Sequence, residues 1–167
     1  MSDDTSQPLM QLSVIDGVAT IRLDSQANRN ALSSVMLGAL HDALDRATKS
    51  DIRTIVLTHS GPVFCSGIDL KERATGSFDS APMAAVFERL MTCDQVTIAA
   101  LKGAVRAGGV GLMASCDLVV VDQSVTFAFT EVRIGVAPAM IAVPILRRVN
   151  STRLAALFLT GESFDVW

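Results

Sequence analysis

The side chains that could act as nucleophiles lie in the stretch GPVFCSGIDL at residues 61–70, which contains Cys65 and Ser66. A nucleophile needs a base within hydrogen-bonding reach, and the base needs a third group that orients it. The chain has two histidines, His41 and His59. Neither lies in a motif that would supply this base, and we expect both at the surface. A hydrolase that uses Cys65 or Ser66 is therefore a distant alternative.

The three cysteines do not form a metal-binding pattern. Cys65, Cys93 and Cys116 are far apart, and no pair of potential ligands has the turn or helical spacing of a zinc site. An odd number of cysteines in no regular spacing indicates a reduced, cytoplasmic chain. The first residues, MSDDTSQ, are acidic and lack the layout of a secretion signal. We therefore expect no metal and a cytoplasmic location.

A second glycine cluster, VRAGGVGLMASCD at residues 105–117, places Gly108, Gly109 and Gly111 before an apolar turn. A helix that begins near Gly108 would present N–H groups without internal partners and the positive end of its dipole. Glycine also lets another atom approach the backbone closely. Such a helix start could bind an anion or a developing oxyanion. A tight strand-to-helix turn with close packing explains the glycines equally well.

Two familiar nucleotide motifs do not fit this cluster. A phosphate-binding loop that began at Gly103 would need lysine and a hydroxyl residue where the chain has Gly109 and Val110. The run GVGLMA matches the alanine variant of the dinucleotide fingerprint, but it begins several residues after the expected strand end. A backbone device remains: two glycine-bearing turns could each donate one N–H to a single carbonyl oxygen on which negative charge develops.

The elements that must position these clusters alternate irregularly between strands and helices. Asp16 and Gly17 join two alternating runs in the manner of a hairpin. Ser33 or Ser34 can cap a helix that extends to about Lys49. Apolar patterns predict further strands at 53–59, 96–103, 117–122 and 125–131, and further helices at 81–94, 139–149 and 151–161.

The continuous apolar runs at 96–103 and 117–122 are typical of buried strands. The pattern as a whole predicts an α/β chain with more strand than a simple doubly wound sheet. A length of 167 residues fits one domain, residues 1–167, with a core of its own. No apolar run is long enough to span a membrane. The net charge of −3 gives no electrostatic case for nucleic acid binding.

Five stretches, in this order and spacing, resemble the crotonase, or enoyl-CoA hydratase/isomerase, superfamily: GVATIRLDSQANRNALS, FCSGIDLKE, GAVRAGGVGLMASCDLVVV, FAFTEVRIGVAP and LTGESFD. The resemblance implies a ClpP/crotonase-type spiral of repeated strand-strand-helix units that assembles as trimers or paired trimers. It implies acyl-coenzyme A thioesters as substrates, with coenzyme A as part of the substrate and no separate cofactor. Two backbone amides of the family stabilise an enolate at the thioester carbonyl.

Carried onto this chain, the resemblance assigns the first oxyanion amide to Ile68 and the second to Gly108. Family members bind the adenine end of coenzyme A near the first cluster, through backbone groups that correspond to Ser66 and Ile68. Arg29, in a loop that borders this pocket, could meet a coenzyme A phosphate. It could equally be a solvated loop charge.

The resemblance also bears on the reaction. Hydratases of the family use two glutamates, of which the first falls on Gly111 and the second on Glu131. One carboxylate is sufficient for a proton shuttle, as in double-bond isomerisation, whereas two suit the addition of water. Glu131 follows Phe127 and Phe129, and an apolar setting would raise its pKa. The alternative is a surface glutamate at the end of a strand.

Family members usually continue well beyond the position where this sequence stops, at Trp167. The further part supplies helices that cover the acyl pocket and build the trimer contacts. We therefore expect a C-terminally truncated crotonase-like core. The principal alternative to an active enzyme is a catalytically inactive remnant that binds acyl-CoA or partner subunits.

Overall fold

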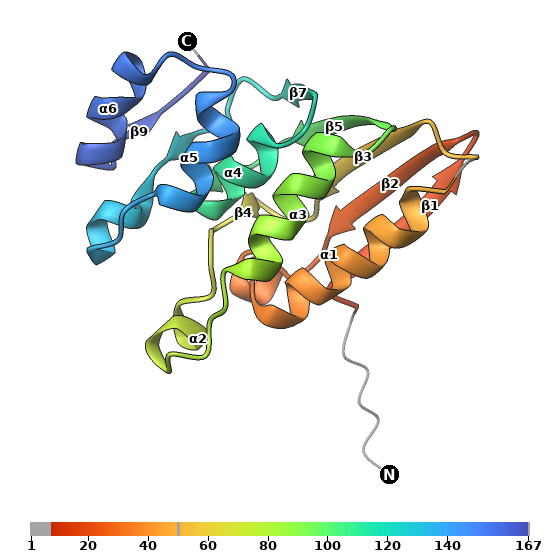
Figure 1. The fold of residues 1–167 in the computed structure, drawn as a ribbon, viewed down its shortest axis with the longest axis horizontal. Helices are drawn as coiled ribbons and strands as arrows, with labels where there is room; N and C mark the ends of the chain where they lie inside the picture. Colours follow the sequence, from red (N-terminus) through yellow and green to blue (C-terminus); the bar gives the residue numbers. More distant parts are fainter. Residues whose placement is uncertain (1–7, 50, 167) are drawn as a thin grey trace.

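The computed structural model describes residues 8–49 and 51–166, and it contains two β-sheets flanked by helices (Figure 1). The strands are β1 (Met10–Ile15), β2 (Val18–Leu23), β3 (Thr54–His59), β4 (Val63–Cys65), β5 (Val96–Leu101), β6 (Ala104–Arg106), β7 (Leu118–Val121), β8 (Phe127–Ala128) and β9 (Ser163–Phe164). The helices are α1 (Ser34–Ala47), α2 (Leu70–Ala74), α3 (Ala81–Thr92), α4 (Gly108–Ala114), α5 (Ala139–Leu146) and α6 (Ser151–Thr160), with 3-10 turns η1 (Gln26–Asn28) and η2 (Thr130–Ile134). The predicted α/β class is confirmed.

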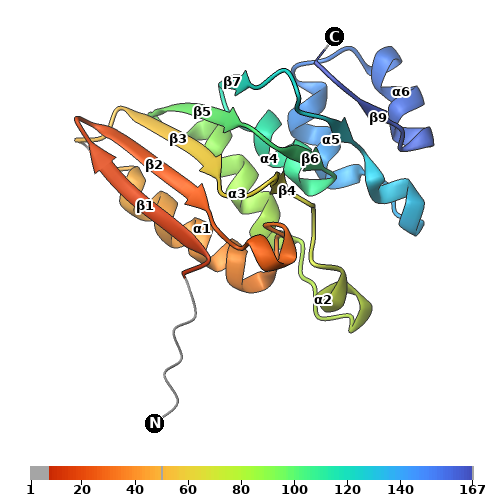
Figure 2. The ribbon, with the colours of Figure 1, turned by 180° about the vertical axis from the view of Figure 1, so that it is seen from behind.

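The larger sheet has the strand order β1-β2-β3-β5-β7. Strands β1 and β2 form the predicted antiparallel hairpin, and the other neighbours run parallel. Asp16 and Gly17 occupy the turn with φ of 50° and 77°, the left-handed conformation that tight hairpins require. Helices α1 and α3 lie over one face of this sheet, and the view from behind shows the opposite face (Figures 1 and 2).

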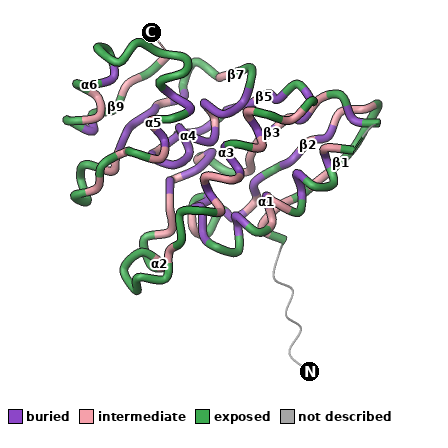
Figure 3. Tube along the Cα trace, viewed as in Figure 1, coloured by how far each residue is buried: buried purple, intermediate pink, exposed green. Residues whose placement is uncertain are grey.

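Helix α1 begins as its sequence predicts. The Ser33 side chain accepts a hydrogen bond from the Met36 N–H at 3.2 Å, which satisfies one of the free donors of the first turn. The apolar positions at helical spacing face inward and are buried: Met36, Leu37, Leu40, Ala43, Leu44 and Ala47. Buried positions concentrate between these helices and the sheet and around α4, whereas α2 is largely exposed (Figure 3).

The smaller sheet, with the order β4-β6-β8-β9, positions both glycine clusters. Strands β4 and β6 are parallel neighbours, so the segments that leave their C-terminal ends emerge side by side. The first segment continues from Cys65 to Ile68, and the second continues from Arg106 into α4. Strand pairing therefore brings together two turns that are far apart in the sequence.

A buried asparagine ties the loop after β2 to the turn before β4. Asn30 is fully buried, and its side-chain oxygen accepts from the Ser25 N–H at 2.7 Å. Its side-chain nitrogen donates to the carbonyls of Ser60 and Val63, at 3.3 Å and 2.8 Å. These bonds satisfy buried backbone groups that would otherwise be costly to leave unpaired. The segment that carries Arg29 is thereby fixed against the entry to β4.

The two strands expected to be buried differ from that prediction. Strand β5 alternates between buried and more open positions. Strand β7 forms the edge of the larger sheet. In the described part of the chain, Leu118 has 54% of its surface exposed to solvent and Val120 has 63%. A continuous apolar run indicates that both faces of a strand are suited to burial, but it does not give the strand's position in the sheet.

Three other expectations need correction. The strand predicted at 125–131 ends at Ala128, so Glu131 lies in the 3-10 turn η2. His41 is half-buried and contacts the Pro82 carbonyl at 3.1 Å. His59 is also half-buried. Its Nε2 accepts a hydrogen bond from the Lys102 N–H at 3.0 Å. Both rings therefore interact with segments that are distant in the sequence.

Helix α4 is packed too closely to hold side chains at two of its positions. A Cβ on Gly109 would lie 2.8 Å from the Cys65 carbonyl oxygen. A Cβ on Gly111 would lie 2.8 Å from a methyl group of Ile141 and 2.9 Å from the ring of Phe87. The close-packing explanation of these glycines is therefore correct for both, independently of any role in binding.

None of the described helices combines the length and the apolar character needed to cross a lipid bilayer.

Replacing Gly111 with alanine should lower the free energy of unfolding, because the added Cβ would collide with Phe87 and Ile141. Such overpacking costs about 1–3 kcal/mol, which exceeds the gain of about 1 kcal/mol from alanine in a helix interior. The matched control is Gly38→Ala in α1, where a Cβ meets no atom within 4 Å and the variant should be slightly stabilised. Urea unfolding followed by circular dichroism measures both. Equal shifts in the same direction would contradict this packing.

Candidate active site

The two glycine clusters meet backbone to backbone. A Cβ on Gly67 would lie 2.8 Å from the Cβ of Ala107 and 3.4 Å from the Gly108 nitrogen. A Cβ on Gly108 would lie 3.5 Å from the Gly67 Cα. Gly67 also has φ of 99°, a conformation that residues with a side chain rarely adopt. Glycine at position 67 therefore permits both the turn and the close approach.

The N–H groups of Ile68 and Gly108 take no part in the strand and helix hydrogen bonds around them. Leu32 pairs with Ile68 in a parallel bridge: its N–H donates to the Gly67 carbonyl at 2.7 Å, and its carbonyl accepts from Asp69 at 3.4 Å. Because the neighbours of Ile68 supply both bonds, its own N–H points away from Leu32. Gly108 is the first residue of α4, so its N–H has no acceptor within that helix.

The turn into α4 is strained. Ala107 has φ of 47° and ψ of −120°, which is uncommon for a residue with a side chain. Its N–H donates to the Ala128 carbonyl at 3.0 Å, and its carbonyl accepts from Val110 at 2.8 Å. Conformations of this kind cost about 1–3 kcal/mol and concentrate at functional sites. Here the strained residue directs the chain from β6 into the helix start at Gly108.

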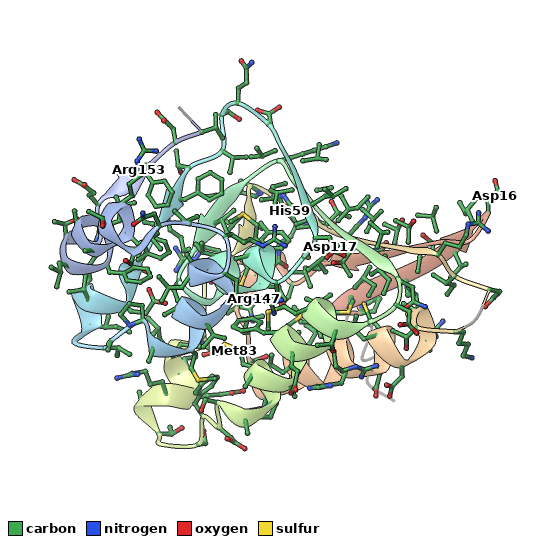
Figure 4. The ribbon with its side chains drawn as sticks, turned by 45° about the horizontal axis from the view of Figure 1, so that its top comes forward. Asp16, His59, Met83, Asp117, Arg147 and Arg153 are labelled. Atoms are coloured by element: carbon green, nitrogen blue, oxygen red, sulfur yellow. The ribbon has the colours of Figure 1, made fainter. Side chains whose placement is uncertain are left out.

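A pocket of about 630 Å³ opens beside these turns. It is lined by all five residues that the resemblance assigned to the site: Arg29, Ser66, Ile68, Gly108 and Glu131. Its volume lies within the range of small-molecule sites. The buried side chain of Met83, on α3, also lines it (Figure 4). A smaller pocket of about 280 Å³, lined by Asp117 and Arg147 among others, contains none of the five.

One carboxylate oxygen of Glu131 lacks a hydrogen-bond partner among the described residues. Its Oε2 atom is buried and has no hydrogen bond within the described part of the chain. Burial raises the pKa of Glu131, and a hydrogen bond to its own backbone opposes part of that increase. The direction of this shift agrees with the sequence-based expectation. An unpaired carboxyl group with a raised pKa at a pocket wall is suited to accept and return a proton.

The position that the resemblance assigns to the first family glutamate is filled by apolar groups. Gly111 lies on α4, and the space that its side chain would occupy belongs to Phe87 and Ile141. A glutamate could not be placed there without displacing α3 or α5. The chain therefore lacks both this carboxylate and the room for it.

The nucleophile alternative loses its support. Cys65 is fully buried, and burial raises the pKa of its thiol to about 12, which keeps it protonated at neutral pH. The Ser66 hydroxyl faces the Asn28 carbonyl at 3.4 Å. His41 and His59 make their hydrogen bonds to other segments, so neither serves Cys65 or Ser66 as a base.

Arg29 is held at the edge of the pocket by its backbone. It has φ of 57° at the end of η1, and its carbonyl accepts from the Ser66 N–H at 3.1 Å. Arg29 and Ser66 are therefore fixed next to each other. Arg29 lines the pocket and is exposed to solvent.

Sequence reasoning missed three further arginines of the pocket: Arg73, Arg106 and Arg133. A signal was present for Arg106, which directly precedes Ala107 and Gly108 at the end of an otherwise apolar strand. A charge in such a strand either has a buried partner or faces a cavity.

Comparisons with known proteins identify the family and the fold. The chain matches the enoyl-CoA hydratase/isomerase family over residues 14–166. It is 35% identical over 159 residues to human enoyl-CoA hydratase domain-containing protein 3, mitochondrial, covering 89% of this chain and 51% of the relative. It is 35% identical over 132 residues to 4-chlorobenzoyl coenzyme A dehalogenase-2 of an Arthrobacter species, covering 73% of this chain and 48% of the relative.

Among solved structures, an enoyl-CoA hydratase from Mycobacterium avium superposes with a TM-score of 0.85 at 38% identity, covering 94% of this chain and 64% of that structure. The structure of the human domain-containing protein 3 gives a TM-score of 0.90 at 28% identity, with 95% and 66% covered. The chain therefore spans about half the length of these curated relatives and about two thirds of these structures. Sequence match and crotonase fold together show that the chain belongs to the enoyl-CoA hydratase/isomerase family.

Proposed function

We propose that this protein acts on acyl-CoA thioesters and stabilises a thioester enolate with the N–H groups of Ile68 and Gly108. The observation that carries this proposal is the backbone contact between the two turns, beside a pocket that Glu131 also lines. The buried Oε2 of Glu131 has no hydrogen bond within the described residues. Two preorganised donors lower the energy of an oxyanion more than that of the neutral carbonyl, so they favour the transition state.

Glu131 moves the proton in this proposal. Its carboxylate takes a proton from the α-carbon of the thioester, and the electrons of that C–H bond form the enolate C=C bond while the carbonyl oxygen gains negative charge. The enolate oxygen is held by the two N–H groups. For a thioester with a double bond one position further along, return of the proton to the far end of the conjugated system completes an isomerisation, and the carboxylate is regenerated.

The closed space at Gly111 favours isomerisation over hydration. Addition of water requires a second group to hold and deprotonate the water molecule. In this chain the ring of Phe87 and a methyl group of Ile141 occupy the place of that group. A single carboxyl group, Glu131, is sufficient for the proton shuttle.

The second candidate function is a catalytically inactive protein that binds acyl-CoA or partner subunits. It is favoured by the exposed apolar edge strand β7. We further propose that a protein of full family length assembles as a homotrimer or hexamer. We also propose a cytoplasmic location, which is supported by the free thiols of Cys65, Cys93 and Cys116.

Glu131→Gln should stabilise the fold at neutral pH. Burial raises the pKa of Glu131 above its unfolded value, so the folded protein binds its proton more tightly, and the wild-type protein loses stability as the pH rises through the folded pKa. Glutamine does not ionise. The stability difference between variant and wild type should therefore grow from pH 4 to pH 8 in urea unfolding experiments. The exposed Glu88→Gln on α3 is the control. A difference independent of pH would contradict the buried setting of Glu131.

The enzyme assays separate the candidate functions. A non-conjugated 3-enoyl-CoA should be converted to the conjugated thioester, seen as a rise in its ultraviolet absorbance, and crotonyl-CoA should not be hydrated. Glu131→Gln should lower the isomerisation rate by about 10²–10⁴-fold, the usual contribution of a general base, and Glu88→Gln should leave it unchanged. Turnover of crotonyl-CoA would contradict the preference for isomerisation. No turnover of either compound, with retained binding of coenzyme A, would identify the inactive protein.

A further inference from the structure

Two of the arginines that sequence reasoning missed, Arg106 and Arg133, lie beside the groups proposed to act on the thioester. Arg106 is the last residue of β6, immediately before the turn that leads to Gly108. Arg133 lies in η2, the same 3-10 turn that carries Glu131. Both residues line the 630 Å³ pocket.

Neutral acceptors hold both guanidinium groups in place. Arg106 donates to the carbonyl of Val105 at 3.0 Å, to the carbonyl of Thr126, and to the Thr126 hydroxyl at 2.8 Å. Arg133 donates to the Gly161 carbonyl at 2.6 Å. These bonds fix the orientation of each group without cancelling its charge. A guanidinium has five N–H donors, so each retains donors for a further acceptor.

Arg106 and Arg133 are close enough for their charges to influence each other, and within the described residues neither forms an ion pair with an acidic side chain. The pKa of Arg106 is lowered, first by burial and then by the charge of Arg133. Within the described part of the chain, the ion pair between Arg89 and Asp45 is the one present, and it joins α3 to α1. No ion pair within the described residues joins Glu131 to either arginine. Like charges at a pocket wall are stabilised when an anion binds between them.

We propose that Arg106 and Arg133 bind an anionic group in the acyl portion of the substrate, so that the preferred substrates are coenzyme A monothioesters of dicarboxylic acids. This inference rests on the proposed function. Arg106 lies two residues before Gly108, and Arg133 lies two residues after Glu131, so both are close in the chain to the groups proposed to act on the thioester. Arg29 is bonded instead to Ser66, in the segment assigned to coenzyme A. Planar guanidinium groups match the geometry of a carboxylate, which they can contact through two parallel hydrogen bonds.

Binding measurements with glutaryl-CoA, butyryl-CoA and free coenzyme A test this inference. The two acyl groups differ only in the terminal carboxylate of glutaryl-CoA. By isothermal titration calorimetry at one ionic strength, glutaryl-CoA should bind about tenfold more tightly than butyryl-CoA, as expected for charge-assisted hydrogen bonds. Added salt should reduce this preference.

Substitutions assign the preference to its residues. Arg133→Gln and Arg106→Gln should each reduce the ratio of the two affinities toward one, while the affinity for free coenzyme A stays unchanged. Arg153→Gln, on the exposed surface of α6, is the control and should keep the ratio (Figure 4). Circular dichroism checks folding, because the hydrogen bonds from Arg106 to Thr126 link β6 to the start of β8. Arg133 is more exposed, so Arg133→Gln keeps the test open if Arg106→Gln does not fold.

Four outcomes would overturn the inference, and they are distinguishable. Equal affinity of the wild-type protein for glutaryl-CoA and butyryl-CoA overturns the proposed preference for a dicarboxylic acyl group but leaves the proposed function standing. A preference that survives both substitutions shows that other residues bind the carboxylate. An equal loss of affinity for free coenzyme A shows that the arginines bind a phosphate of coenzyme A instead. No binding of any of the three ligands overturns the proposed function, and this inference with it.

Discussion

The site depends on a contact between two peptide backbones that leaves no room for side chains. Strands β4 and β6 are parallel neighbours, and their continuations meet where Gly67 lies against Ala107 and Gly108. A side chain at Gly67 would collide with the Cβ of Ala107 and separate the turns, and with them the two N–H groups of Ile68 and Gly108. The same requirement extends into α4, where Gly109 packs against the end of β4. Close packing and the proposed chemistry are therefore two consequences of the same geometry.

Around this contact the protein keeps polar groups that would be more stable elsewhere. Glu131 has a buried oxygen without a partner, Ala107 has a strained backbone, and Arg106 and Arg133 place like charges near each other. Each feature opposes folding, and all of them line one pocket or direct the chain toward it. The remainder of the fold contributes compensating stability through the buried face of α1 and the satisfied hydrogen bonds of Asn30. Such a concentration of unfavourable groups is typical of a site that binds and transforms a ligand.

Local signals in the sequence predicted the elements whose causes are local. Asp16 and Gly17 determine their hairpin, and Ser33 caps α1, because each acts on residues within the same turn. The convergence of Arg29, Ile68 and Glu131 followed from the resemblance, since it arises from pairing between distant strands. The exposure of β7 could not be predicted because an apolar pattern does not reveal which strand lies at a sheet edge. The hydrogen bond between His59 and Lys102 and the influence of the Arg133 charge on Arg106 both arise between segments that are distant in the sequence, and neither relation leaves a pattern in it.

The central claim is that the N–H groups of Ile68 and Gly108 donate to one thioester oxygen. Infrared difference spectroscopy of bound butyryl-CoA, labelled with ¹³C at the thioester carbonyl, measures this interaction directly, since hydrogen bonds to the oxygen weaken the C=O bond. We predict that the carbonyl band of the bound thioester lies at lower frequency than that of the free compound in water. A bound thioester whose band is unshifted, or shifted to higher frequency, would show that the two N–H groups do not meet at its oxygen.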